Sequence, residues 1–72
     1  MEMTVSSPIA GSDRTVLVVD DDRVFRARLA HAMEARGFEV YTADSASEGL
    51  RLAVDRRPAF AIVDLRARPR TY

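Results

Sequence analysis

The 72-residue sequence predicts an α/β domain built on a parallel β-sheet. Short runs rich in β-branched residues alternate with stretches of helical periodicity, in the order β-α-β-α-β. The first and third runs are almost continuously apolar, which is typical of parallel strands buried on both faces of a sheet. The connections between the elements are short, and right-handed crossovers make such strands parallel.

The first strand and helix are predicted between residues 15 and 36. Thr15–Val19 is the first strand, and three consecutive aspartates follow it at 20–22. A helix is expected over 23–36, with Asp22 as its N-cap, because aspartate is a preferred capping residue. Gly37 suits the position just after the helix. The apolar residues at helical spacing, which predict the inward face of this helix, are Phe25, Leu29, Ala32 and Met33.

The second half of the chain repeats the alternation. Residues 38–42 are β-prone and predict the second strand. Ser45 and Glu48 match a capping box, which opens a second helix that Pro58 ends. The predicted inward face of this helix consists of Ala46, Leu50, Ala53 and Val54. Residues 59–63 form the third predicted strand, which ends at Asp64.

The two ends of the chain lack this pattern. Residues 1–13 contain serines, a proline and a glycine, and predict a flexible leader. The domain is expected at 14–66, and residues 67–72 look like an unrelated tail. Two helices cover three strands thinly, and the third strand is expected to present an open edge. We therefore expect an incomplete domain that self-associates through this strand edge and the first helix.

Composition excludes several classes of protein. Eleven basic residues, all arginine, balance eleven acidic ones, which argues against a nucleic-acid-binding protein. The chain has no cysteine and one histidine, His31, so thiolate and zinc sites are not expected. His31 is expected to be a surface residue. No apolar run approaches the length of a membrane span, and no signal peptide is recognisable, so a soluble cytoplasmic protein is expected.

Carboxylates follow the ends of two predicted strands. Asp20, Asp21 and Asp22 come after the first strand, and Asp64 ends the third. In open α/β sheets, ligands bind beyond the carboxyl ends of the strands. If these two strands are neighbours, they lie about 4.8 Å apart, and Asp21 and Asp64 face a common volume. Clustered carboxylates repel each other, and Mg²⁺ suits such a site. An aspartate beside Mg²⁺ can act as a nucleophile toward phosphorus.

These motifs carry a resemblance to a known family. The segment Leu-Val-Val-Asp-Asp-Asp over 17–22, followed by a helix with Phe25 and Arg26, resembles the receiver domain of two-component response regulators. The segment Phe-Ala-Ile-Val-Asp-Leu-Arg over 60–66 resembles the phosphoacceptor strand of that domain. The Asp-Leu-Arg ending and the Arg-Gly-Phe-Glu-Val segment over 36–40 look most like regulators of the RegA/PrrA/ActR type.

The resemblance implies a flavodoxin-like fold with its first three strands in the order 2-1-3. It implies that Asp64 accepts phosphate from a sensor histidine kinase. Mg²⁺ would be bound by Asp20, Asp21, Asp64 and the backbone carbonyl of Arg66. Receivers also use a hydroxyl residue after a fourth strand and a lysine after a fifth, and this chain contains no lysine. We therefore expect a truncated, poorly competent signalling module that is not an enzyme and does not bind nucleic acid or membrane directly.

Two other functions fit parts of the sequence. Asp20-x-Asp22-x-Val24 matches the signature of haloacid dehalogenase-type phosphohydrolases, with Asp20 as nucleophile and Asp22 as general acid. That family's later serine or threonine, lysine and acidic pair have no counterpart here. The chain could also be an inert fragment, or a small interaction module that binds a kinase or a full-length regulator.

Overall fold

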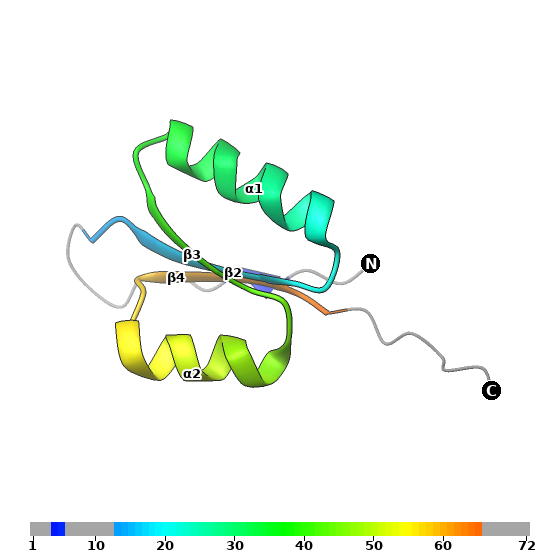
Figure 1. Ribbon diagram of the computed structural model, residues 1–72. Coiled ribbons are helices and arrows are strands. Elements are labelled where there is room, and N and C mark those ends of the chain that lie inside the picture. The colour runs from blue at the N-terminus through cyan, green and yellow to red at the C-terminus, as the bar shows by residue number, and fades with distance from the viewer. Residues whose placement is uncertain (1–3, 6–12, 66–72) are drawn as a thin grey trace.

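The computed structural model describes residues 4–5 and 13–65 of the chain. They form an α/β arrangement with one helix on each side of a sheet (Figure 1). The elements in chain order are β1 (Thr4–Val5), β2 (Thr15–Asp20), α1 (Arg23–Ala35), β3 (Glu39–Ala43), α2 (Ala46–Arg56) and β4 (Phe60–Asp64). From β2 onward this order confirms the predicted β-α-β-α-β sequence.

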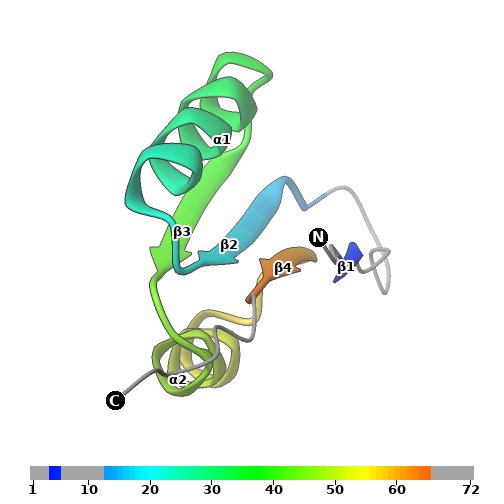
Figure 2. The same cartoon turned by 90° about the vertical axis from the view of Figure 1, so that its right-hand side faces the viewer.

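The sheet has the order β1-β4-β2-β3. Strand β2 pairs in parallel with both β3 and β4 and lies between them, as Figure 2 shows. For the three predicted strands this is the order 2-1-3 of a flavodoxin-like fold. The expected fold class is confirmed for the part of the chain that the structure describes.

Strand β1 corrects two expectations. The leader was predicted to contribute no element, yet Thr4–Val5 pairs antiparallel with β4, with Thr4 opposite Val63 and Val5 opposite Ile62. The outer edge of β4 is therefore covered over these two positions and is not fully open. This contact joins segments far apart in sequence, so no local pattern predicts it. The tail predicted at 67–72 lies outside the described residues.

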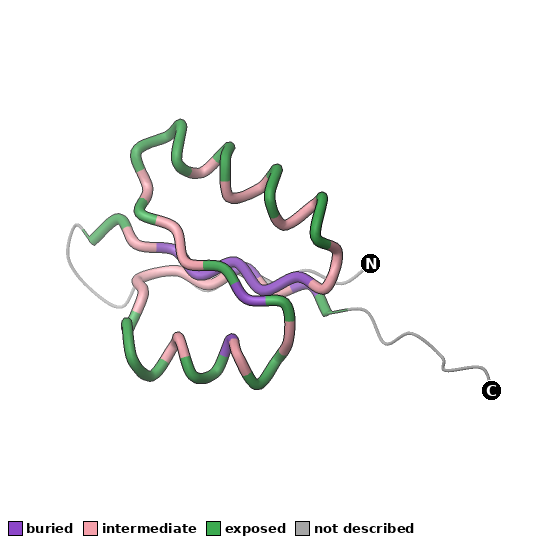
Figure 3. The backbone as a smooth tube through the Cα atoms, viewed as in Figure 1, coloured by how far each residue is buried: buried purple, intermediate pink, exposed green. Residues whose placement is uncertain are grey.

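Each face of the sheet carries its own small hydrophobic core. On the α1 side, Val16, Val18 and Ile62 are buried, and Leu29 and Met33 of α1 pack against them. The alternate residues of β2 point to the α2 side and form the second core. Every residue of β2 from Val16 to Asp20 is buried, and the purple segment in Figure 3 follows this strand. The prediction of a strand buried on both faces is confirmed for β2.

Helix α1 begins and ends largely as predicted. The Asp22 side chain accepts hydrogen bonds from the backbone N–H groups of Val24 and Phe25 at 3.0 and 3.1 Å, which confirms it as the N-cap. Gly37 follows the helix with a φ of +90°, a backbone conformation that residues other than glycine rarely adopt. The predicted inward face is right for the two residues that pack on the sheet but wrong for Ala32, which is exposed.

Helix α2 is turned differently from the prediction. Ser45 caps it by accepting a hydrogen bond from the Glu48 backbone N–H at 3.2 Å. Leu50 and Val54, expected to be buried, are 67% and 65% exposed. Gly49 is instead buried against the sheet, and its lack of a side chain lets the helix approach β2 closely. Helical periodicity identified an apolar stripe here, but the close approach at a glycine decided which side faces the core.

The described residues include no helix long and apolar enough to cross a membrane.

Candidate functional site

The parallel register of the sheet brings two of the predicted aspartates together. Asp20 ends β2 and Asp64 ends β4, and the two residues are direct partners in the β2–β4 pairing. Neighbouring strands lie about 4.8 Å apart, so both side chains leave the same edge of the sheet side by side. The prediction had Asp21 and Asp64 face a common volume, and the register shows Asp20, another of the predicted ligands, as the direct neighbour of Asp64.

Both carboxylates are almost completely removed from solvent. Asp20 is 3% exposed and Asp64 is 2% exposed. Both Asp64 carboxylate oxygens and Asp20 Oδ2 are buried and accept no hydrogen bond from the described residues. Buried carboxylate oxygens that accept no hydrogen bond are costly, because their desolvation is not repaid. Such a pair favours a binding or reactive role over a purely structural one.

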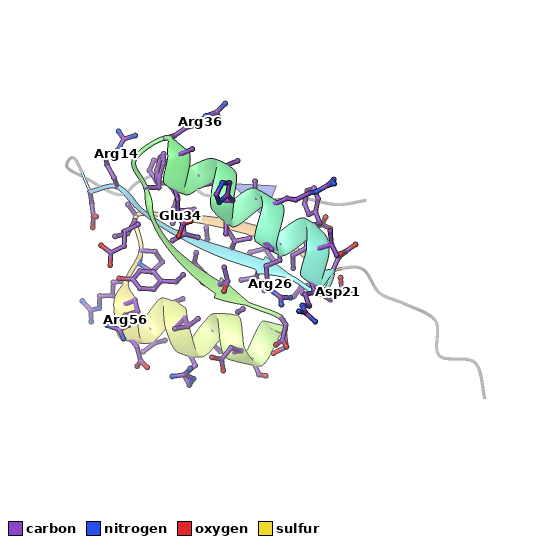
Figure 4. The ribbon with its side chains drawn as sticks, turned by 45° about the horizontal axis from the view of Figure 1, so that its top comes forward. Arg14, Asp21, Arg26, Glu34, Arg36 and Arg56 are labelled. Carbon is purple, nitrogen blue, oxygen red and sulfur yellow. The ribbon has the colours of Figure 1, made fainter. Side chains whose placement is uncertain are left out.

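The turn between β2 and α1 presents the remaining acidic residues. Asp20 Oδ1 accepts a hydrogen bond from the Asp22 backbone N–H at 2.8 Å, which closes the turn on itself. Asp21 is half-buried at this end of the sheet, where Figure 4 labels it beside the start of α1. The Asp22 carboxylate is engaged as an acceptor at the helix N-terminus. That engagement argues against the phosphohydrolase alternative, in which Asp22 must donate a proton.

One residue at this edge was not assigned a role from the sequence. Arg26 of α1 is half-buried, and its Nη1 donates a hydrogen bond to the backbone carbonyl of Asp20 at 2.9 Å. The Arg26 backbone N–H also bonds to the Asp22 carbonyl at 2.8 Å, as in any first helical turn. A signal was present in the sequence: a basic residue near a helix N-terminus opposes the helix dipole. Its presence there suggests a compensating contact, and the contact observed is with a backbone carbonyl.

The oxygen atoms at the acidic edge are candidate ligands for a divalent cation. Among residues 4–5 and 13–65, no three carboxylate or imidazole side chains are already gathered as a metal cluster. Mg²⁺ commonly uses one or two protein carboxylates and keeps several waters. The buried oxygens of Asp20 and Asp64 that lack hydrogen bonds fit that smaller requirement. The fourth predicted ligand, the carbonyl of Arg66, lies outside the described residues.

The α2 side of the sheet carries a concave apolar feature. A cavity of about 240 Å³ opens between α2 and the sheet, lined by apolar side chains that include Leu50, Val63 and Leu65. No carboxylate lines it. The cavity is thus separate in its chemistry from the aspartate pair.

Two polar pairs on the surface shift the pKa values of Tyr41, Glu48 and Arg51. A hydrogen bond from Arg51 lowers the pKa of Glu48 on the surface of α2, and the same bond raises the pKa of Arg51. The hydrogen bond from the Tyr41 hydroxyl to Glu39 raises the pKa of that tyrosine. These are surface pairs that stabilise local structure, and none of them contacts Asp20 or Asp64.

Comparison with known proteins bears on what this edge does. The chain is 57% identical over 56 residues to the photosynthetic apparatus regulatory protein RegA of Cereibacter sphaeroides, covering 78% of this chain and 30% of that protein. It is 52% identical over 58 residues to the acid tolerance regulatory protein ActR of Sinorhizobium medicae, covering 81% of this chain and 30% of that protein. Its homologues are response regulators of the RegA, ActR and PrrA type.

The third relative extends the same likeness. The transcriptional regulatory protein PrrA of Mycobacterium tuberculosis is 40% identical over 65 residues, covering 90% of this chain and 25% of that protein. The chain spans about 30% of the length of the first relatives it matches. No family model matches the chain. No solved structure matches it either. The predicted resemblance to regulators of the RegA/PrrA/ActR type is confirmed.

Proposed function

We propose that this chain is a phosphoacceptor module of a two-component system and that Asp64 is the residue phosphorylated. The observation that carries the proposal is the burial of Asp64 at the strand end, with both carboxylate oxygens accepting no hydrogen bond from the described residues. Its partner in the sheet register is a second buried aspartate, Asp20. The relatives, which are named as regulatory proteins, support the same reading.

The proposed reaction is a phosphoryl transfer between a histidine and an aspartate. A carboxylate oxygen of Asp64 donates an electron pair to phosphorus and forms a mixed anhydride. The bond between phosphorus and the imidazole nitrogen of a sensor kinase breaks, and that nitrogen keeps the bonding pair. Mg²⁺, when bound, would neutralise charge on the transferred group. Asp20 and Asp21 are the proposed cation ligands beside Asp64, because they leave the same edge of the sheet.

We propose that this transfer is slow in the 72-residue chain. Receiver domains use a lysine close to the phosphorylated aspartate, and this sequence has none. Without the positive charge of a lysine in addition to that of Mg²⁺, less of the negative charge on the transferred phosphoryl group is compensated. A cytoplasmic location and the absence of direct nucleic-acid or membrane binding stay predictions.

The decisive experiment measures covalent phosphorylation directly. The chain is incubated with acetyl phosphate and Mg²⁺, and bound phosphoryl groups are detected by intact mass spectrometry before and after hydroxylamine, which cleaves acyl phosphates. We expect partial, hydroxylamine-sensitive labelling that is lost in Asp64→Asn. Asp55→Asn is the matched control, because Asp55 is an exposed aspartate on α2. Labelling that depends on Asp20 and not on Asp64 would support the phosphohydrolase alternative, and unlabelled wild-type chain would contradict the proposal.

Self-association also stays a prediction, with its surfaces revised. The β4 edge carries β1, whereas the outer edge of β3 has no neighbouring strand among the described residues. Among the large exposed apolar side chains, Val24 lies on α1, the helix where the prediction had placed the exposed surface, and Leu50 and Val54 lie on α2. Sedimentation velocity over a range of concentrations would measure association, and Leu50→Ser with Val54→Ser would weaken it if α2 is the contact surface.

A further inference from the structure

Two arginines lie at the end of α1 where the helix dipole is least favourable to them. Arg23 is the first residue of the helix and Arg26 lies one turn further on. The first turn contains no acidic residue to offset them. Cations are favoured near the C-terminus of a helix and disfavoured near its N-terminus. A contact that outweighs this disadvantage would account for an arginine at this position.

The two arginines differ in what they contact. Arg23 is exposed. Arg26 is half-buried, and its guanidinium donates to the carbonyl oxygen of Asp20 at 2.9 Å. Figure 4 labels Arg26 beside Asp21, at the end of the sheet where the acidic residues gather. The side chain of Arg26 therefore reaches back across the turn to the last residue of β2.

We propose that Arg26 is a positioning residue that fixes the turn from Asp20 to Asp22 and so holds the carboxylates at the edge of the sheet in their binding arrangement. The proposal rests on the proposed function in that these carboxylates are taken to bind a divalent cation. Three contacts define the turn: the guanidinium on the Asp20 carbonyl, the Asp22 N–H on Asp20 Oδ1, and the Asp22 cap on α1. The first is made by a side chain from outside the turn.

A positioning role and a purely electrostatic role of Arg26 predict opposite changes in Mg²⁺ affinity when the side chain is replaced. A positive guanidinium near the site repels Mg²⁺, so removing charge alone tightens binding. Removing the contact that orders the turn weakens binding, because the carboxylates must then be ordered when the cation binds. The sign of the change in affinity therefore separates the two roles.

The matched pair of variants is Arg26→Met and Arg23→Met. Both remove one positive charge from the same end of α1 and keep a long side chain, but only the first removes the contact with Asp20. Affinity for Mg²⁺ alone is measured by NMR titration of the backbone amides. We expect Arg26→Met to raise the Mg²⁺ dissociation constant about 5-fold, the equivalent of one hydrogen bond. Arg23→Met is expected to leave it unchanged or lower it.

A second measurement needs no metal. In the metal-free chain, Arg26→Met should speed hydrogen exchange at the backbone amide of Asp22, which bonds to Asp20 Oδ1. Arg26→Lys keeps the charge and can donate one hydrogen bond, so it should recover part of the protection and part of the Mg²⁺ affinity. It also serves as the test variant if the methionine variant does not fold.

The outcomes separate this proposal from the proposed function. If Arg26→Met leaves the turn unchanged in the metal-free chain, or tightens Mg²⁺ binding as Arg23→Met does, the positioning role is overturned while the phosphoacceptor site stands. If the wild-type chain binds no Mg²⁺ and takes no phosphoryl group, but the turn loosens in Arg26→Met, the proposed function fails and the role of Arg26 in the turn is supported.

Discussion

Gly49→Ala is expected to destabilise the protein, although the change favours a helix. Gly49 lies in the interior of α2, where alanine is preferred over glycine by ~1 kcal/mol. A Cβ added at Gly49 would lie 2.8 Å from Cγ2 and 3.2 Å from Cγ1 of Val19. Val19 is branched at Cβ, 3% exposed and on the central strand, so it has little freedom to move away. Overpacking of this kind costs about 1–3 kcal/mol, so the net loss should be ~1 kcal/mol.

Urea unfolding followed by circular dichroism measures this loss as a change in the free energy of unfolding. The informative control is the same substitution in a Val19→Ala background, where the clashing methyl groups are gone and Gly49→Ala should become stabilising by up to ~1 kcal/mol. The pair Val54→Ala and Val54→Gly calibrates helix propensity at an exposed position of α2. The reasoning is refuted if Gly49→Ala stabilises the wild-type chain, or if its effect is the same in both backgrounds.

Three further predictions test other parts of the structure. Asp22→Ala should lower the free energy of unfolding by ~1 kcal/mol in the same assay, and Asp22→Asn should retain most of it, because asparagine also caps helices; equal losses would contradict the capping role. Glu48 should titrate below its ordinary pKa of 4.5, so its ion pair stabilises α2 above that pH and is lost as pH falls through the lowered value. NMR titration should find the pKa restored in Arg51→Met, and an unchanged value would refute the assignment. Proline at both positions of Thr4–Val5 should speed amide hydrogen exchange in β4, whereas the double variant Thr4→Val/Val5→Thr should not. Equal rates of hydrogen exchange in the two variants would mean that β1 does not protect this edge.

The acidic edge was predictable in its residues but not in its geometry. Asp20 and Asp64 could be identified because each follows an apolar strand, and parallel strands end at a common edge. The exact pairing of Asp20 with Asp64 depends on the register between β2 and β4, which long-range packing sets. The contact of Arg26 with the Asp20 carbonyl depends on the path of a long side chain back across a turn. Periodicity carries no information about such a path.

The sequence by itself determined the order of the elements, both helix N-caps and the glycine that ends α1. These features depend on residues within a few positions of one another, through helical periodicity and local hydrogen bonds. Only the tertiary structure decided that β1 covers part of the β4 edge and that Gly49, with the residues beside it, turns α2 so that Leu50 and Val54 face solvent. Both outcomes depend on contacts between segments distant in the chain, where the space left by neighbouring side chains determines which of several locally acceptable arrangements forms.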